Sequence, residues 1–164
     1  MPGLPGLWRA VVLLLMAAVP MGGCVAAPGV HVDPPRLAET TEHAAVLVFT
    51  IQARNDGPRE LPLRMVDYAL EIDGRKVFDG RRSAEATLSA NDQQRVELPV
   101  PIRWEDLPQG PVRYRLRGRL GYTLPGIFVR ALFDAGLYRP QVGFALRGEL
   151  DGRALRGGDP GQGP

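Results

Sequence analysis

The sequence predicts an all-β protein, a two-sheet β-sandwich of immunoglobulin-like type with about seven strands and one short helix. Three observations favour this fold. Short runs in which apolar and polar residues alternate fill residues 30–150. The 20 glycines and 16 prolines are spread between these runs, where they supply turns. No hydrophobic period typical of a solenoid or a coiled coil is present, and the 45% hydrophobic and 23% charged residues are typical of a globular domain.

The first half of the domain contains the first strands and a hairpin turn. Residues 30–37 form a short extended segment, which the pair Pro34-Pro35 stops. Residues 45–53 and 65–72 alternate between apolar and polar side chains, as a strand with one buried face does. Asp73-Gly74 follows directly and predicts a hairpin turn. The side chains expected in the core here are Leu47, Phe49, Ile51, Val66, Tyr68, Leu70 and Ile72.

Two further strands and a loop follow the hairpin. Residues 86–89 are a short strand, and residues 94–102 alternate again. Pro99 and Pro101 fall on the outward face of this second strand and have no amide hydrogen to donate, so we expect it at the edge of a sheet. Residues 103–110 are expected to form a loop or a single helical turn.

The last third of the chain contains two strands, the helix and a tail. Residues 112–122 and 142–150 alternate as strands do. Residues 127–135 favour the one short helix, and Gly136 is expected to end it. From residue 151 to residue 164 the chain is mainly glycine, proline and charged residues, and we expect this segment to be a disordered tail.

The N-terminal segment has the layout of a secretory signal. Arg9 supplies a positive charge ahead of the unbroken apolar run of residues 10–19, and Pro20 ends this run. The run is about half as long as a membrane-spanning helix. The alternative is a buried N-terminal helix, which we disfavour because no polar residue gives the run an amphipathic face.

The only cysteine of the chain follows this segment. Met21-Gly22-Gly23-Cys24 resembles the lipobox of bacterial lipoproteins, in which a signal peptidase cuts before a diacylated cysteine. Its last two residues match the most constrained positions of that motif, and its first two are less usual. We therefore predict that residues 1–23 are a lipoprotein signal peptide, that Cys24 is the lipidation site, and that residues 24–29 tether the domain to the lipid bilayer.

The residue after the cysteine indicates the cellular compartment. Val25 follows the cysteine, at a position where aspartate usually signals retention in the inner membrane of Gram-negative bacteria. The expected location is therefore the cell envelope of a bacterium, on the outer membrane facing the periplasm.

A single cysteine also excludes an intrachain disulfide, so the core alone must hold the domain together.

The central strands carry two short motifs in a fixed order. Residues 68–74 have the order tyrosine-x-leucine-x-hydrophobic-x-glycine within a strand and its turn, and residues 96–100 read Val-Glu-Leu-Pro-Val. This order resembles the group 2 late embryogenesis abundant (LEA type 2) proteins, also called the water stress and hypersensitive response (WHy) domain. Asn55 occupies the first position of the Asn-Pro-Asn turn that such proteins typically carry, but Asp56 and Gly57 depart from it.

The resemblance covers residues 30–102 closely and residues 111–150 in outline. It implies a small β-sandwich of immunoglobulin or fibronectin-III type, with no catalytic residues and a role in tolerance of desiccation and related stress. Such domains often occur in bacteria as exported lipoproteins, which agrees with the separate interpretation of Cys24.

No group of residues predicts an enzyme, a cofactor or a metal site. His31 and His43 lack the spacing of metal ligands, and we expect both to be exposed to solvent. Asp67, Glu71 and Asp73 recur at strand spacing and share a face, which we interpret as a solvated sheet surface. A catalytic role for these carboxylates would need a cleft that shifts their pKa values.

One strand carries four arginines in alternate positions. Its period of two places Arg113, Arg115, Arg117 and Arg119 on one face, along about 20 Å. We expect acidic residues on neighbouring strands to pair with them, with Asp67, Glu71 and Glu97 as candidates. The alternative is that this face binds an anionic surface. We do not expect nucleic acid as a partner, because no aromatic side chain is interleaved on the same face.

Together these observations predict a non-enzymatic, membrane-anchored lipoprotein that protects the cell during desiccation or water stress. A second hypothesis is an adaptor of the cell envelope, which would bind a protein or an anionic polymer through the arginine face. An enzyme, the third hypothesis, would require a pocket with converging polar groups.

Overall fold

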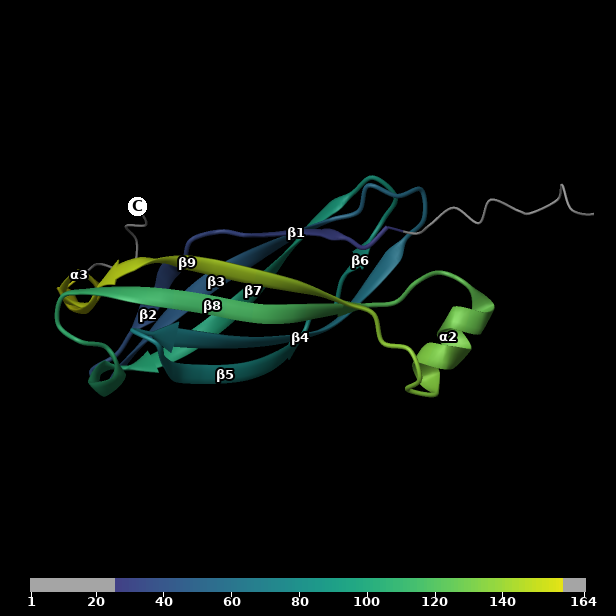
Figure 1. Ribbon diagram of the computed structural model, residues 1–164. Coiled ribbons are helices and arrows are strands. Elements are labelled where there is room, and N and C mark those ends of the chain that lie inside the picture. Colours follow the sequence, from purple (N-terminus) through teal and green to yellow (C-terminus); the bar gives the residue numbers. More distant parts are fainter. Residues whose placement is uncertain (1–25, 158–164) are drawn as a thin grey trace, which may run out of the picture.

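The computed structural model describes residues 26–157, so residues 1–25, among them the predicted signal peptide and Cys24, and residues 158–164 lie outside it. Within the described residues, nine strands form two antiparallel sheets, a 3-10 turn and a short α-helix connect strands, and a second short α-helix follows the last strand (Figure 1). The core lies between the two sheets. The predicted all-β sandwich is therefore confirmed.

The smaller sheet is built around β3 (Ala44–Arg54). On one side, β7 (Gln93–Arg103) pairs with β3 along its whole length. On the other side, β1 (Gly29–Val32) and β2 (Arg36–Thr40) pair with β3 one after the other. Because Pro34-Pro35 lies between them, the single predicted segment becomes two strands. Within the described chain β7 pairs with no strand other than β3, which is the edge position that its two prolines predicted.

The larger sheet has the strand order β5-β4-β8-β9. At its centre are β4 (Leu61–Ile72) and β8 (Pro111–Tyr122), and its edges are β5 (Arg75–Ser83) and β9 (Gln141–Asp151). The two-residue strand β6 (Thr87–Leu88) pairs with the beginning of β4. Since β8 has a neighbour on each side, its outward face is the middle of an open sheet surface.

The turn between β4 and β5 is the predicted hairpin. Ile72 pairs with Arg75, which leaves Asp73 and Gly74 as the two turn residues. Their φ angles are 48° and 83°. Positive φ at both positions matches the twist of the two strands, and glycine adopts it without steric cost.

The core is formed by the inward faces that the alternation predicted. The ring of Phe49 on β3 meets that of Tyr114 on β8 edge to face, with 5.7 Å between the ring centres. The hydroxyl of Tyr68 on β4 donates a hydrogen bond of 2.8 Å to the carbonyl oxygen of Pro99 on β7. Both contacts join one sheet to the other. The largest fully buried side chains are Phe49, Leu47, Ile51, Leu61, Leu70, Leu88, Leu98, Ile102, Leu107, Leu116, Leu120 and Val66.

Two helical elements occur where the sequence predicted them. The 3-10 turn η1 (Trp104–Asp106) lies within the expected loop after β7, and α2 (Ile127–Asp134) joins β8 to β9. Gly136, with a φ angle of 72°, follows the last turn of α2. Among the described residues, no helix has the length and apolar character needed to cross a membrane.

The prediction of a disordered tail from residue 151 is wrong for its first part. Asp151 ends β9, and residues 152–157 form the helix α3 (Gly152–Gly157). Arg156 holds this helix in place, because its guanidinium lies 5.0 Å from the centre of the Trp104 ring and donates a hydrogen bond of 2.8 Å to the carbonyl oxygen of Leu107. These partners are about 50 residues away in the sequence, so composition alone could not reveal them.

Candidate functional site

The predicted lipidation site Cys24 lies outside the described residues. Only Val25 separates it from Ala26, where the description of the chain begins. Ala26 and Ala27 are exposed, and β1 starts at Gly29.

The four arginines of β8 all lie on the outward face of the larger sheet. Arg113, Arg117 and Arg119 are exposed and Arg115 is half-buried, whereas the intervening Leu116 is fully buried. The alternation therefore placed these side chains correctly. The arginines run in a row along β8, with β4 on one side and β9 on the other.

Only one arginine of this row has an ion pair in the part of the chain that the structure describes. Arg117 binds Glu71 on β4. Of the other expected partners, Asp67 pairs with an arginine on β5, and Glu97 pairs with an arginine on the smaller sheet. The predicted salt-bridged face is therefore correct for Arg117 and wrong for the rest of the row.

The remaining arginines and their neighbours form a cationic surface. Arg113, Arg115 and Arg119 make no ion pair within residues 26–157, and Nε of Arg115 has no hydrogen-bond partner there. Arg147 on β9 pairs with Arg115 in the strand register, which adds a further cation. A hollow of about 460 Å³ is lined by Arg113, Arg115 and Arg147, and the carboxylates of Glu71 and Glu149 also lie at its wall. Anions are the ligands that such a group of guanidinium side chains can bind.

The acidic side chains singled out in the sequence all have structural partners. Asp67 and Glu71 form the ion pairs described above, and the Asp73 carboxylate accepts a hydrogen bond of 3.0 Å from the backbone amide of Arg113. His31 is exposed, as predicted, with Nε2 3.6 Å from Asp33. No group of three or more histidine, cysteine or acidic residues that could hold a metal ion occurs in residues 26–157.

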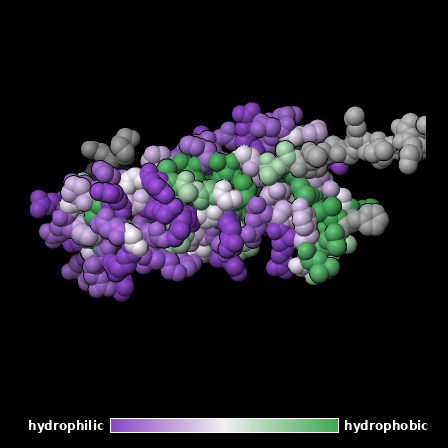
Figure 2. All heavy atoms as spheres, viewed as in Figure 1, coloured by the Kyte–Doolittle hydropathy of each residue, from purple (hydrophilic) through white to green (hydrophobic). Residues whose placement is uncertain are grey.

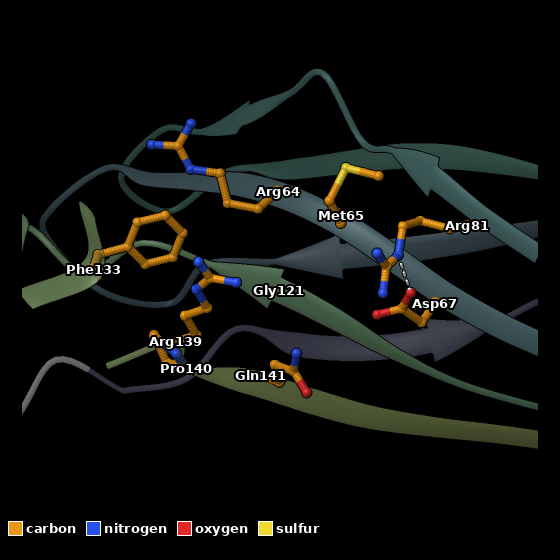
Figure 3. A pocket seen from close by; sticks show the side chains of 9 residues that line it. All are labelled: Arg64, Met65, Asp67, Arg81, Gly121, Phe133, Arg139, Pro140 and Gln141. Carbon is orange, nitrogen blue, oxygen red and sulfur yellow. Dashed lines mark hydrogen bonds and ion pairs between the residues drawn. The ribbon is translucent and has the colours of Figure 1, made fainter. Parts of the chain in front are cut away.

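A second surface was not foreseen from the sequence. The helix α2 lies beyond the end of the larger sheet (Figure 1), and its side chains Val129 and Phe133 are half-buried. The guanidinium of Arg64 lies 5.4 Å from the centre of the Phe133 ring, and its Nε donates a 2.8 Å hydrogen bond to Oγ1 of Thr123. A cavity of about 340 Å³ lies between α2 and the sheet, and Figure 3 shows Met65 and the ring of Phe133 at its wall.

The sequence contained one signal for this surface. Residues 127–138 include seven apolar or aromatic side chains larger than alanine, in a segment that joins two already amphipathic strands. The apolar side of a surface helix typically faces a contact, so this excess of apolar residues could have indicated a contact beyond the sandwich.

Comparison with known proteins identifies the family. The model of the family described as "Late embryogenesis abundant protein" (LEA_2) matches residues 50–135, more than half of the chain. The chain belongs to the late embryogenesis abundant family. This family is related to water stress, and its members are generally non-enzymatic. No curated protein matches the chain.

Solved structures share the fold of this LEA domain at low sequence identity. A protein from Arabidopsis thaliana, solved in solution, is 16% identical with a TM-score of 0.60, and the match covers 77% of this chain and 83% of that one. A second solution structure, described as a candidate late embryogenesis abundant (LEA) protein, is 15% identical with a TM-score of 0.58 over 87% and 77%. A crystal structure from Archaeoglobus fulgidus is 13% identical with a TM-score of 0.53 over 77% and 97%.

The turn at which this chain departs from the LEA pattern keeps one anchoring residue. Asn55 is buried, with 2% of its surface exposed. Its side-chain amide donates hydrogen bonds to the carbonyl oxygens of Arg59 and Ser89, and its side-chain oxygen accepts one from the amide of Gly57. The first asparagine therefore ties the turn between β3 and β4 to the chain just after β6.

Proposed function

We propose that this LEA protein is a non-enzymatic lipoprotein, anchored through acylated Cys24, that protects the bacterial cell envelope during desiccation and other water stress. The family membership carries the proposal, because the family is related to water stress. The lipobox-like residues that end at Cys24 support the anchor. The absence of aspartate at residue 25 favours the outer membrane, with the domain facing the periplasm.

The physical basis of protection would be a stable, polar body held close to the membrane. The two sheets bury their apolar side chains between them, and their outward faces carry ion pairs such as Arg36–Glu97 and Lys76–Asp79. No disulfide or metal is needed for such a core, which also suits a chain with one cysteine. A hydrated domain of this kind would separate neighbouring proteins and membrane surfaces when water is withdrawn.

Mass spectrometry of the mature N-terminus tests the anchor. We expect a chain that begins at residue 24 and carries acyl chains on the cysteine, and we expect Cys24→Ala to leave an unacylated protein that is released from the membrane fraction. Survival after drying tests the role. Deletion of the gene should lower survival, and the wild-type chain should restore it more fully than Cys24→Ala. Unchanged survival after deletion would reject the protective role, and an unmodified cysteine would reject the anchor.

A second candidate function is recognition of an anionic polymer or an envelope protein through the arginine face. The specific observation in its favour is that Arg113, Arg115 and Arg119 have no ion pair in residues 26–157. Inorganic polyphosphate is a suitable probe of this face. Arg113→Glu combined with Arg119→Glu should abolish binding, and binding by the wild type should weaken as salt is raised.

A matched control uses arginines away from this face. Arg59 and Arg95 are exposed and form no ion pair in the described chain, so replacing both with glutamate gives the same change of net charge. If this control loses polyphosphate binding as strongly as the β8 variant does, net charge rather than the arginine face is responsible. The second function would then be withdrawn.

A further inference from the structure

The large hydrophobic side chains that are exposed in the described part of the chain are gathered at one place. Five large hydrophobic side chains are exposed among those the structure describes, and all five lie on α2, just after it, or beside the cavity under it. Figure 2 shows hydrophobic residues together over α2, next to surfaces that are mainly hydrophilic. The five are Ile127 (87% exposed), Leu137 (76%), Tyr138 (45%), Leu132 (44%) and Met65 (41%). A cluster of this kind marks a contact site.

The helix α2 is apolar on the side that faces the domain and also on the side that faces away. Val129 and Phe133, which lie one turn apart, are half-buried, and the ring of Phe133 lies against Arg64 of β4. Ile127 and Ala131 are likewise one turn apart, and both are exposed. Burial of Val129 and Phe133 therefore explains only part of the apolar surface of α2, since Ile127 and Ala131 are left exposed in the described part of the chain.

This surface lies at the end of the sandwich where the chain enters the domain. Gly29 at the start of β1 pairs with Arg54 at the end of β3. Tyr122 at the end of β8 pairs with Leu63 near the start of β4. Since the turn of residues 55–60 joins the end of β3 to the start of β4, the start of β1 and the end of β8 lie at the same end. Figure 1 shows α2 there, and α3 at the opposite end.

The length of the tether limits where a bilayer can lie. Five residues of fully extended chain span about 18 Å, so Cys24 cannot lie farther than this from Gly29. The 12-residue strand β8 is about 40 Å long, which separates the α3 end of the domain from this region. An acyl anchor on Cys24 would therefore hold the α2 end of the sandwich, and not its α3 end, against the membrane.

We infer that α2 and the turn after it form a second membrane contact, in which Ile127, Leu132 and Leu137 enter the interfacial layer of the bilayer that holds the anchor. This inference rests on the proposed acylation of Cys24. An interfacial helix of this kind buries its apolar face by about 5–10 Å. Tyrosine is enriched at such interfaces, which suits Tyr138.

The charges around α2 fit a lipid surface with anionic headgroups. Arg130 on α2 and Arg139 after it are exposed, and Asp134 is the acidic residue between them. A cation beside a buried apolar group is the arrangement by which interfacial helices bind anionic membranes. The anchor also raises the local concentration of the bilayer around α2, so even a weak lipid contact would be occupied.

Site-specific labelling of the acylated protein tests this contact. Because acylation consumes the only native cysteine, Leu137→Cys and Ala154→Cys each create a single free thiol for an environment-sensitive fluorophore. Ala154 is exposed on α3 and serves as the matched control at the far end. The proteins are placed in vesicles of phosphatidylethanolamine and phosphatidylglycerol that contain lipids with a quencher on the acyl chain. We expect a blue shift and quenching at residue 137, and neither at residue 154.

The outcomes separate this contact from the anchor. Mass spectrometry of the same samples reports acylation of Cys24, so a failed anchor is recognised without reference to α2. In the acylated protein, equal and unquenched emission at residues 137 and 154 overturns the contact. A blue shift at residue 137 that lipid quenchers do not affect also overturns it, because a second copy or another protein then covers α2.

A charge variant provides an independent check. Ile127→Glu combined with Leu137→Glu changes two highly exposed side chains, so the fold should be kept, as circular dichroism can verify. A fluorophore at residue 132 should lose its quenching in this variant and keep it in the otherwise wild-type chain. Retained quenching in the charge variant would contradict the inference.

Discussion

Replacing Asn55 with alanine removes the side chain that organises the turn between β3 and β4. The amide group donates a hydrogen bond of 2.7 Å to the carbonyl oxygen of Arg59 and one of 2.9 Å to that of Ser89. The side-chain oxygen accepts a third, of 3.0 Å, from the amide of Gly57. With 2% of its surface exposed, Asn55 is one of the two buried polar residues of the described chain.

The expected cost follows from these three hydrogen bonds. Each contributes about 1 kcal/mol net to the free energy of unfolding, so the substitution should lower that free energy by about 3 kcal/mol. For a domain of this size, such a loss corresponds to a fall of about 10 °C in Tm. Water can reach the carbonyl groups of the exposed residues Arg59 and Ser89 once the amide is gone, which makes this value an upper estimate.

Urea unfolding followed by the fluorescence of Trp104 measures the effect. The matched control is Asp56→Ala in the same turn, since Asp56 is exposed and forms a surface ion pair of 2.6 Å with Arg54. An ion pair of this kind contributes about 0–1 kcal/mol, so the control should unfold close to the wild type. If Asn55→Ala is no less stable than Asp56→Ala, its buried side chain does not anchor the turn, and the reasoning is refuted.

Three further variants test the packing of the domain. Tyr68→Phe should cost about 1 kcal/mol through the lost hydrogen bond between the sheets. Burial raises the pKa of Tyr68, so the neutral phenol stabilises the folded state below the ordinary tyrosine pKa. This stabilisation is lost as pH rises through the higher pKa of the folded state. The free energy of unfolding of Tyr68→Phe should therefore lack the part of the alkaline decrease that Tyr68 causes in the wild type. Gly118→Ala should cost about 1–3 kcal/mol because the new Cβ would lie 2.6 Å from a backbone carbonyl of β4, whereas Gly143→Ala, whose nearest neighbour is 4.0 Å away, should be tolerated. Arg156→Ala should release α3 and shift the fluorescence of Trp104; an unchanged spectrum would contradict the role given to Arg156.

The local alternation of apolar and polar residues was sufficient to predict which side chains of the strands point into the core. The inward residues of β3, β4, β7 and β8 are those that alternation predicted, because the side of a strand to which a residue points depends only on its position in that strand. The hairpin at Asp73-Gly74 and the end of α2 near Gly136 were equally local, since each depends on a residue that accepts positive φ.

The partners of charged residues were not predictable in this way. Glu71 pairs in the strand register with Arg115, yet its carboxylate binds Arg117, so even the correct register would have suggested the wrong pair. In the same manner α3 owes its place to contacts of Arg156 with residues about 50 positions earlier, which composition cannot show.

By itself, the sequence determined the fold class, the faces of the strands and the family, because alternation, turn residues and motifs are properties of neighbouring residues. Only the tertiary structure decided which arginines of β8 remain without an ion pair, and that the apolar side of α2 lies at the end where the chain enters the domain. Both depend on how distant segments are brought side by side. The two surfaces proposed to act, the arginine face and α2, are therefore products of the fold.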